Sequence, residues 1–157
     1  IADVVYNFSM SIGGANSAGS PTSSDGFVYN NTFLKRDTSL NAYFTAVYIN
    51  AGGQSNIQIK NNLAYAPGST KDGNQNGASP VFIGLGVGVT TANYTASSNS
   101  SDAQVKTTNP FLVAVPVTAA EFTPTGYAVN GGEYVPVKTD FYNTAITGTR
   151  KIGAIQP

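Results

Sequence analysis

Short runs of β-branched and aromatic residues recur along the whole chain, separated by turn-forming pairs such as Gly13-Gly14, Pro67-Gly68 and Gly131-Gly132. Alternating or β-branched runs of about four to eight residues between such breakers are typical of strands. No window of about twelve residues combines an apolar helical stripe with good helix formers. The sequence therefore predicts an all-β chain, with strands in residues 4–8, 26–34, 43–50, 57–63, 81–90, 111–117, 127–129 and 134–138.

Three of these runs end in asparagine and align with one another. The runs 27–33 and 57–63 align through their asparagine pairs, Asn30-Asn31 and Asn61-Asn62, which are offset by 31 positions, and residues 4–8 align with 27–31 at an offset of 23. Stacked parallel strands bring equivalent residues about 4.8 Å apart, where asparagine side chains can form a hydrogen-bonded ladder. The repeat therefore favours a parallel solenoid with loops of variable length. Because asparagine also tolerates turns after any strand, an antiparallel β-sandwich or jelly roll is the alternative.

Composition excludes several classes of site. The chain has no Cys and no His, so it holds no disulfide, thiol nucleophile or Ser-His-Asp triad of its own. Charged residues make up 10%, and eight basic and eight acidic side chains cancel, which excludes the positive field that a nucleic-acid partner requires. No apolar stretch of about 18 residues predicts a membrane span. Asn, Ser and Thr supply 47 of 157 residues, a surface suited to hydroxyl-rich partners such as polysaccharides.

The last third of the chain carries residues that resemble a known superfamily. Residues 109–113, 121–124 and 127–132 precede an Asp-Phe pair at 140–141 and the stretch Gly-Thr-Arg-Lys-Ile-Gly-Ala at 148–154. This pattern resembles the closing coils of secreted right-handed parallel β-helix proteins, which include polysaccharide lyases, glycoside hydrolases and phage tailspikes. The resemblance covers roughly residues 26–155. It implies a right-handed parallel β-helix with a C-terminal cap.

The implied organisation is a single domain, with β-helix coils in residues 1–108 and the last coils and capping segment in residues 109–157. Because the chain begins with Ile1 and not Met, we expect it to be part of a longer polypeptide. A cap must cover the apolar end of a solenoid and its unpaired backbone groups. The expected cap residues are Phe141 and Ile152 as apolar cover and Asp140 paired with Arg150.

Lyases of this superfamily use a Lys or Arg base, and the resemblance gives Lys35, Arg36 and Lys60 as candidates. A Lys acts as a base near neutral pH when it is desolvated or lies beside another cation, a condition that Lys35 next to Arg36 meets weakly. A solvated turn is the alternative interpretation. Glycoside hydrolysis needs two converging carboxyl groups. The eight acidic residues are scattered, so no complete hydrolase site is expected within this chain.

Asp72, Asn74 and Asn76 alternate before Gly77, like the first half of a calcium-binding loop. Such a loop needs a Glu at its twelfth position, where this chain has Ile83. We therefore interpret the segment as a surface loop and expect neither a metal nor a cofactor.

Tyrosine is the residue type best suited to stack on pyranose rings, while neighbouring amides and hydroxyls bind sugar hydroxyls. The candidate carbohydrate-binding residues are Tyr29, Tyr43, Tyr48 and Tyr65. Tyr43 and Tyr48 lie five residues apart in one predicted strand, so at most one of them points outward.

The sequence predicts a polysaccharide-recognising module of an extracellular, secreted or virion-associated protein, such as the C-terminal part of a tailspike. Two alternatives stay open. One is a polysaccharide lyase that uses Lys35 or Lys60 as its base. The other is a purely structural assembly module, or a capsid or adhesin domain. The expected partners are a glycan surface and either a second copy of the chain or a part that precedes Ile1.

Overall fold

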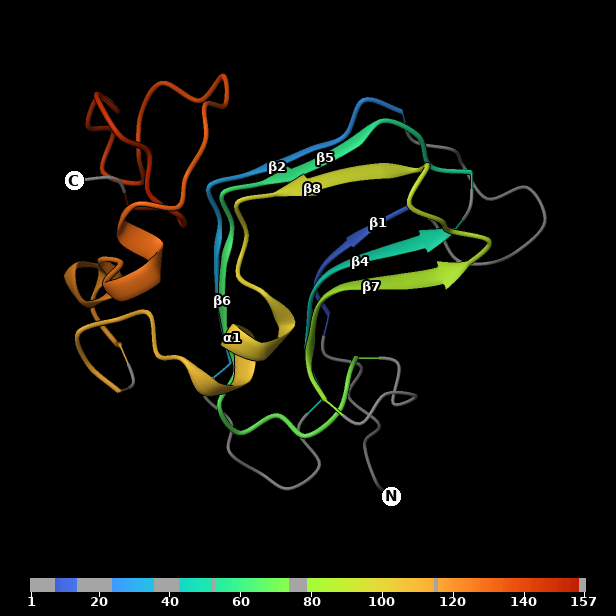
Figure 1. Cartoon of the computed structure of the whole chain (residues 1–157), viewed down its shortest axis with the longest axis horizontal. Coiled ribbons are helices and arrows are strands. Elements are labelled where there is room, and N and C mark those ends of the chain that lie inside the picture. Colours follow the sequence, from blue (N-terminus) through green and yellow to red (C-terminus); the bar gives the residue numbers. More distant parts are fainter. Residues whose placement is uncertain are drawn as a thin grey trace.

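Parallel strands dominate the computed structural model, which describes residues 8–13, 24–35, 43–51, 53–73, 79–114 and 116–155. Figure 1 shows strands on two sides of the fold and short helical turns beside them. The strands are β1 (Phe8–Ile12), β2 (Phe27–Tyr29), β3 (Thr32–Leu34), β4 (Thr45–Ala51), β5 (Ile57–Lys60), β6 (Leu63–Tyr65), β7 (Val81–Val87) and β8 (Tyr94–Ser97). The helical elements are α1 (Asp102–Thr107) and the 3-10 turns η1 (Ala119–Phe122) and η2 (Gly126–Val129).

The strands form three sheets, ordered β1-β4-β7, β2-β5-β8 and β3-β6. The first pass is β1 to β3, the second β4 to β6, and the third β7, β8 and α1. The two larger sheets take one strand from each pass, and the sheet β3-β6 takes one strand from each of the first two. Among the described residues the sheets do not close into a barrel. All pairings between these strands are parallel, so the antiparallel sandwich or jelly roll is wrong.

Residues in the left-handed conformation make the corners of each pass. Asp25 and Asn56, with φ of 59° and 50°, stand before β2 and β5. Asn30, Asn61 and Ser98, with φ of 53°, 56° and 52°, follow β2, β5 and β8. Asn and Asp adopt this conformation more readily than most residues, because a short polar side chain can hydrogen-bond locally. These corners split each predicted run at 26–34 and 57–63 into two strands.

An asparagine ladder joins the three passes. The side-chain oxygen of Asn62 accepts from the backbone and side-chain nitrogens of Asn31, each at 2.9 Å. The side-chain oxygen of Asn99 accepts in the same way from Asn62, again at 2.9 Å. The amides of Asn62 and Asn99 donate to the carbonyls of Val28 and Ile59. The ladder steps are 31 and 37 residues, so the predicted 31-residue offset is confirmed.

The apolar core lies between the sheets, on the inward side of the alternating strands. Its members are buried aliphatic and aromatic side chains from all three passes, including Val28, Phe44, Val47, Ile49, Ile57, Ile59 and Phe82. Phe33 and Phe82 meet edge to face, with ring centroids 6.5 Å apart. This core fixes which side chains of each strand are left to face outward.

The other predicted repeat, residues 4–8, is wrong where the structure describes it. Phe8 belongs to β1 and pairs with Thr45 of β4, so it lies in a different sheet from residues 27–29. Residues 4–7 lie outside the described residues. The shared Asn was a coincidence of composition here, since Asn is common in this chain.

Helix α1 takes the place of a third strand in the last pass. Ser101 and Gln104 form a capping box, in which the Ser101 side chain accepts from the Gln104 backbone and the Gln104 side chain accepts from the Ser101 backbone. The carbonyl of Val105 then accepts from the backbone of Ala66, next to β6. The sequence analysis looked for an apolar stripe in long windows, and a helix as short as α1 is not found in that way.

The C-terminal residues after α1 form no further named strand in the described part of the chain. Residues 127–129, predicted as a strand, lie in η2. Phe111 forms an isolated antiparallel bridge with Pro124. Residues 134–138 are assigned to no strand. Apolar and β-branched composition predicted a strand in residues 134–138, but among the residues that the structure describes they have no neighbouring strand with which to pair.

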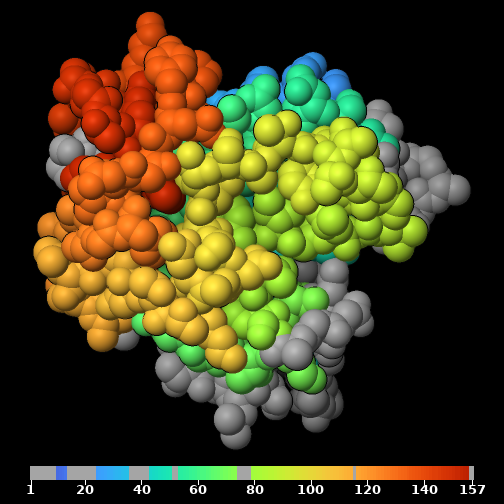
Figure 2. All heavy atoms as spheres, viewed as in Figure 1, coloured from blue at the N-terminus to red at the C-terminus, as the bar shows by residue number. Residues whose placement is uncertain are grey.

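This C-terminal segment covers the flank of the passes, where Figure 2 shows it in orange and red along one side of the molecule. Ile152, Phe111 and Ala128 form a second buried cluster with Leu63, which faces away from the main core. The backbone of Gly153 donates to the carbonyl of Asn61 at 2.7 Å. The predicted lid over the end of the stack is therefore a cover on the outer side of β3 and β6.

The cap residues are divided between two environments. Ile152 is buried against the sheet as expected, whereas Phe141 is 68% exposed. Asp140 accepts from the backbones of Tyr142 and Thr144, each at 2.9 Å. Arg150 donates to the carbonyl of Val137 at 2.9 Å and lies over a tyrosine ring. The pairing of Asp140 with Arg150 stays a prediction.

Candidate functional site

The outward side of sheet β2-β5-β8 gathers polar and aromatic side chains in two rows. One row is Phe27, Gln58 and Thr95, and the other is Tyr29, Lys60 and Ser97, as the strand register dictates. Between the rows, Val28 and Ile59 point into the core. We call these six outward side chains the outer face. In Figure 1 the sheet β2-β5-β8 lies above the sheet β1-β4-β7, and the outer face belongs to its side away from that sheet.

Aromatic rings occupy the first strand of the outer face. The ring centroids of Phe27 and Tyr29 are 5.7 Å apart, and Phe27 is 58% exposed. The Tyr29 hydroxyl donates to the side-chain oxygen of Gln58 at 2.7 Å. This bond holds the phenol toward the second pass and leaves an apolar ring surface beside polar groups.

Glu133, from the C-terminal segment, borders the face at the carboxyl ends of its strands. Its backbone nitrogen donates to the Asn61 side chain at 2.8 Å, and its carbonyl accepts from the same side chain at 2.7 Å. Its carboxylate lies 3.7 Å from Lys60 Nζ and accepts from the Ser97 hydroxyl. The corner residue Asn61 thus fixes the backbone that carries this carboxylate.

Burial raises the pKa of Tyr29, and the negative charge of Glu133 raises it further. The phenol therefore keeps its proton through the neutral range and stays a hydrogen-bond donor. The outer face combines aromatic surface, an amide, hydroxyls, an ammonium and a carboxylate. Such groups stack on sugar rings and exchange hydrogen bonds with hydroxyls.

The structure brings two of the predicted site residues together, since Tyr29 and Lys60 are direct neighbours across β2 and β5. They had been assigned different roles, one in carbohydrate binding and one in catalysis. The charged partner of Lys60 in the described part of the chain is the carboxylate of Glu133, 3.7 Å from Nζ, and the catalytic role of Lys60 stays a prediction.

The remaining candidates lie elsewhere. Lys35 Nζ donates to the carbonyl of Tyr43 at 2.8 Å, and the Tyr43 ring lies under Lys71. Tyr48, in β4, is only 8% exposed. Tyr65 packs edge to face on an aromatic ring of the C-terminal segment. Arg36 lies outside the described residues.

Lys35 and Lys60 do not form a joint site. The backbone of Lys35 donates to Tyr65, at the far end of β6, whereas Lys60 precedes the corner before β6. The left-handed corner at Asn61 lies between these positions, so Lys60 belongs to sheet β2-β5-β8 whereas Lys35 lies beside the end of sheet β3-β6. The candidate tyrosines likewise come from different sheets.

Sequence reasoning missed Phe27, Gln58, Thr95, Ser97 and Glu133. The first two could have been found from the 31-residue offset, because it aligns Phe27 with Gln58 and Tyr29 with Lys60. Thr95 and Ser97 needed the 37-residue step of the next pass. No pattern indicates Glu133, which reaches Asn61 across 72 residues of chain.

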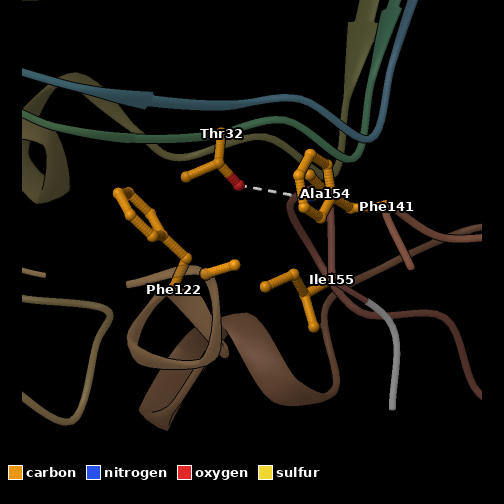
Figure 3. A pocket seen from close by; sticks show the side chains of 6 residues that line it. Thr32, Phe122, Phe141, Ala154 and Ile155 are labelled. Atoms are coloured by element: carbon orange, nitrogen blue, oxygen red, sulfur yellow. Dashed lines mark hydrogen bonds between the residues drawn. The ribbon is translucent and has the colours of Figure 1, made fainter. Parts of the chain in front are cut away.

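Apart from the outer face, a cavity lies where the C-terminal segment meets β3, as Figure 3 shows. It encloses about 300 Å³ and is lined mainly by apolar side chains, namely Ala119, Phe122, Phe141, Ala154 and Ile155, with Thr32. The Thr32 hydroxyl accepts from the backbone of Ala154 at 3.0 Å. The cavity presents few polar groups that could orient a ligand, so the outer face is the stronger candidate site.

Among the described residues, no three acidic side chains converge as they would around a metal ion. Of the proposed calcium loop, Asn74 and Asn76 lie outside the described residues. In the same described part of the chain, every helix is too short or too polar to cross a membrane. A comparison of the chain with known protein families, curated proteins and solved structures finds no match.

Proposed function

We propose that this chain is a polysaccharide-binding module with the fold of a right-handed parallel β-helix, and that sugar binds on the outer face. The three parallel passes joined by an asparagine ladder support the fold. The surrounding protein would be tailspike-like or carbohydrate-active, and extracellular, secreted or virion-associated. The resemblance of the C-terminal residues to β-helix proteins supports this setting.

The observation that carries the proposal is the alignment of Phe27 and Tyr29 beside the hydrogen-bonding side chains of Gln58, Lys60 and Ser97. Exposed aromatic rings supply stacking area at a low entropic cost. Repetition of the pass extends hydrogen-bonding groups at the strand spacing of about 4.8 Å. A surface of this kind suits an extended chain of sugars better than a single small molecule.

Binding without bond cleavage accounts better for the contacts than a lyase does. The candidate lyase bases are Lys35, Arg36 and Lys60. Lys60 is paired with Glu133, and Lys35 donates to a backbone carbonyl. A purely structural module would leave the aromatic pair Phe27 and Tyr29 without a role.

The test is the affinity of the chain for soluble polysaccharides in gel electrophoresis and calorimetry. Phe27→Ala and Tyr29→Ala should each weaken binding about tenfold or more, because each removes stacking area worth roughly 1.4 kcal/mol. Tyr142→Ala is the matched control, since it removes a half-exposed tyrosine of the C-terminal segment. Equal affinities for all three variants and the native chain would refute the proposal.

A further inference from the structure

The charges around the outer face are unevenly distributed. Its ammonium group, Lys60, lies 3.7 Å from the carboxylate of Glu133. At the opposite end, Asp25 stands two residues before β2, at the corner where its carboxylate accepts from the side chain of Asn56. The described charges on and beside the face are thus two carboxylates and one ammonium. The positive group is already compensated before any ligand arrives.

The position of Glu133 is built into the fold. Both backbone groups of Glu133 are held by the Asn61 side chain, and its carboxylate also accepts from Ser97. The carboxylate therefore cannot easily swing away when a ligand approaches Lys60. An anionic sugar would have to displace Glu133 from Lys60 or accept a like charge beside it, and either costs binding energy.

We infer that the outer face selects uncharged polysaccharides, and that Glu133 is the residue that excludes uronate-containing ones. This inference rests on the proposed function, because it names the class of polysaccharide that the same site takes. Hydroxyl groups of a neutral sugar can donate to the carboxylate and accept from the ammonium of the pair. A uronate carboxylate can do only the second.

The experiment uses polymers that share a backbone and differ in charge. The probes are polygalacturonate against its methyl ester, and carboxymethyl cellulose against hydroxyethyl cellulose. The native chain should bind an uncharged member of a pair at least about fivefold more tightly than its charged counterpart. That margin corresponds to one like-charge contact at about 4 Å that is screened as in bulk water. The difference should shrink as salt concentration rises, because the surface charges are screened.

Glu133→Gln should narrow or reverse this preference, because it removes the carboxylate and leaves Lys60 available to a uronate. Gln keeps an oxygen that can accept from Ser97. Glu121→Gln is the matched control for net charge, since its carboxylate lies in η1 and caps local backbone groups. The Glu121→Gln variant should show the same preference for uncharged over charged polymers as the native chain. The double variant Lys60→Gln with Glu133→Gln should lose the gain in uronate binding.

The outcomes separate the two levels of the claim. If the native chain binds neither member of either pair, the proposed function fails. If it binds the charged members more tightly, or if Glu133→Gln leaves the preference unchanged, the selectivity fails and the binding function stands. Should Glu133→Gln unfold, the salt dependence of the native chain still decides, because rising salt must improve binding of the charged member relative to the neutral one.

Discussion

The strand passes and the C-terminal segment achieve order by different means. In the passes, backbone groups pair with the equivalent groups one pass away, and the same side chain, asparagine, repeats at each level. In the described residues from 108 onward no contact repeats from pass to pass, and some backbone groups are satisfied by nearby side chains, as where Asn109 both accepts from Phe111 and donates to Val113. A ladder residue of the middle pass is held by hydrogen bonds to the passes on both sides of it, whereas these hydrogen bonds of the Asn109 side chain lie within a single turn.

The two regions nevertheless build one site. The outer face supplies flat rows of side chains from three passes, and the segment supplies Glu133 at their edge. The repeating part provides area, and the irregular part provides a specific charge. Loss of a ladder residue should therefore destabilise all three passes, whereas loss of a contact in the segment should destabilise only the part of the molecule beside that contact.

The largest expected effect is that of Asn62→Ala, in the middle of the ladder. Asn62 accepts two hydrogen bonds from Asn31 and donates to Val28 and to Asn99. Its removal leaves buried donors and acceptors unpaired, which should lower the free energy of unfolding by about 3–5 kcal/mol. Urea denaturation measures the change.

Asn109→Ala is the matched control for Asn62→Ala. Asn109 also joins a backbone donor to a backbone acceptor, but at a partly exposed position of the C-terminal segment. Its loss should cost about 0.5–1.5 kcal/mol, because water can replace the partners. An equal loss of unfolding free energy in the two variants would show that the ladder stabilises the fold no more than a local turn does.

A smaller, more local effect is expected for Ile152→Ala, which opens the cluster between the segment and β6. The cavity should cost about 2–4 kcal/mol. Amide hydrogen exchange should rise mainly in the segment, at sites such as the Ile152 amide bonded to Ala128. Ile59→Ala, in the main core, should raise exchange in all three passes. The same exchange pattern in both variants would contradict a separate flank cluster.

The smallest expected effect concerns alkaline stability. Burial raises the pKa of Tyr127, although the hydrogen bond with Ser100 at 3.0 Å opposes the shift. Because the folded pKa lies above the unfolded one, the stability from the neutral phenol is present below about pH 10. It is lost as pH rises through the folded pKa. Above about pH 10, Tyr127→Phe should lose less unfolding free energy per pH unit than the native chain.

Denaturation series at about pH 8 and pH 10.5 measure this difference. Tyr142→Phe, which removes a half-exposed phenol in the same segment, is the control. Tyr29, whose pKa is also raised, accounts for part of the decline that remains in Tyr127→Phe. An identical pH dependence in the native chain and Tyr127→Phe would show that Tyr127 titrates alike in the folded and unfolded states.

The sequence allowed prediction of the first ladder step because Asn30-Asn31 and Asn61-Asn62 are identical pairs. The second step was hidden, since Ser98 replaces the first asparagine of the pair while adopting the same left-handed conformation. β8 was missed because Tyr94–Ser97 is short and mostly polar. The all-β prediction held, apart from α1 and the 3-10 turns.

The sequence analysis named only part of the candidate site. Tyr29 was named because tyrosine stacks on sugar rings and Lys60 because lyases use a basic residue, and the 31-residue periodicity places the two side by side. Periodicity says nothing of a contact that is made once, such as that between Glu133 and Lys60. Such contacts depend on how an irregular segment packs, which is set by Ile152, Phe111 and Ala128 together.

The most direct test of the account is nuclear magnetic resonance of the labelled chain during titration with a bound oligosaccharide. Backbone and side-chain signals of Phe27, Tyr29, Gln58, Lys60 and Ser97, together with Glu133, should shift progressively, while those of β1, β4 and β7 stay in place. Shifts confined to β1, β4 and β7, or to the cavity around Phe122 and Phe141, would contradict the assignment of the outer face as the sugar-binding surface.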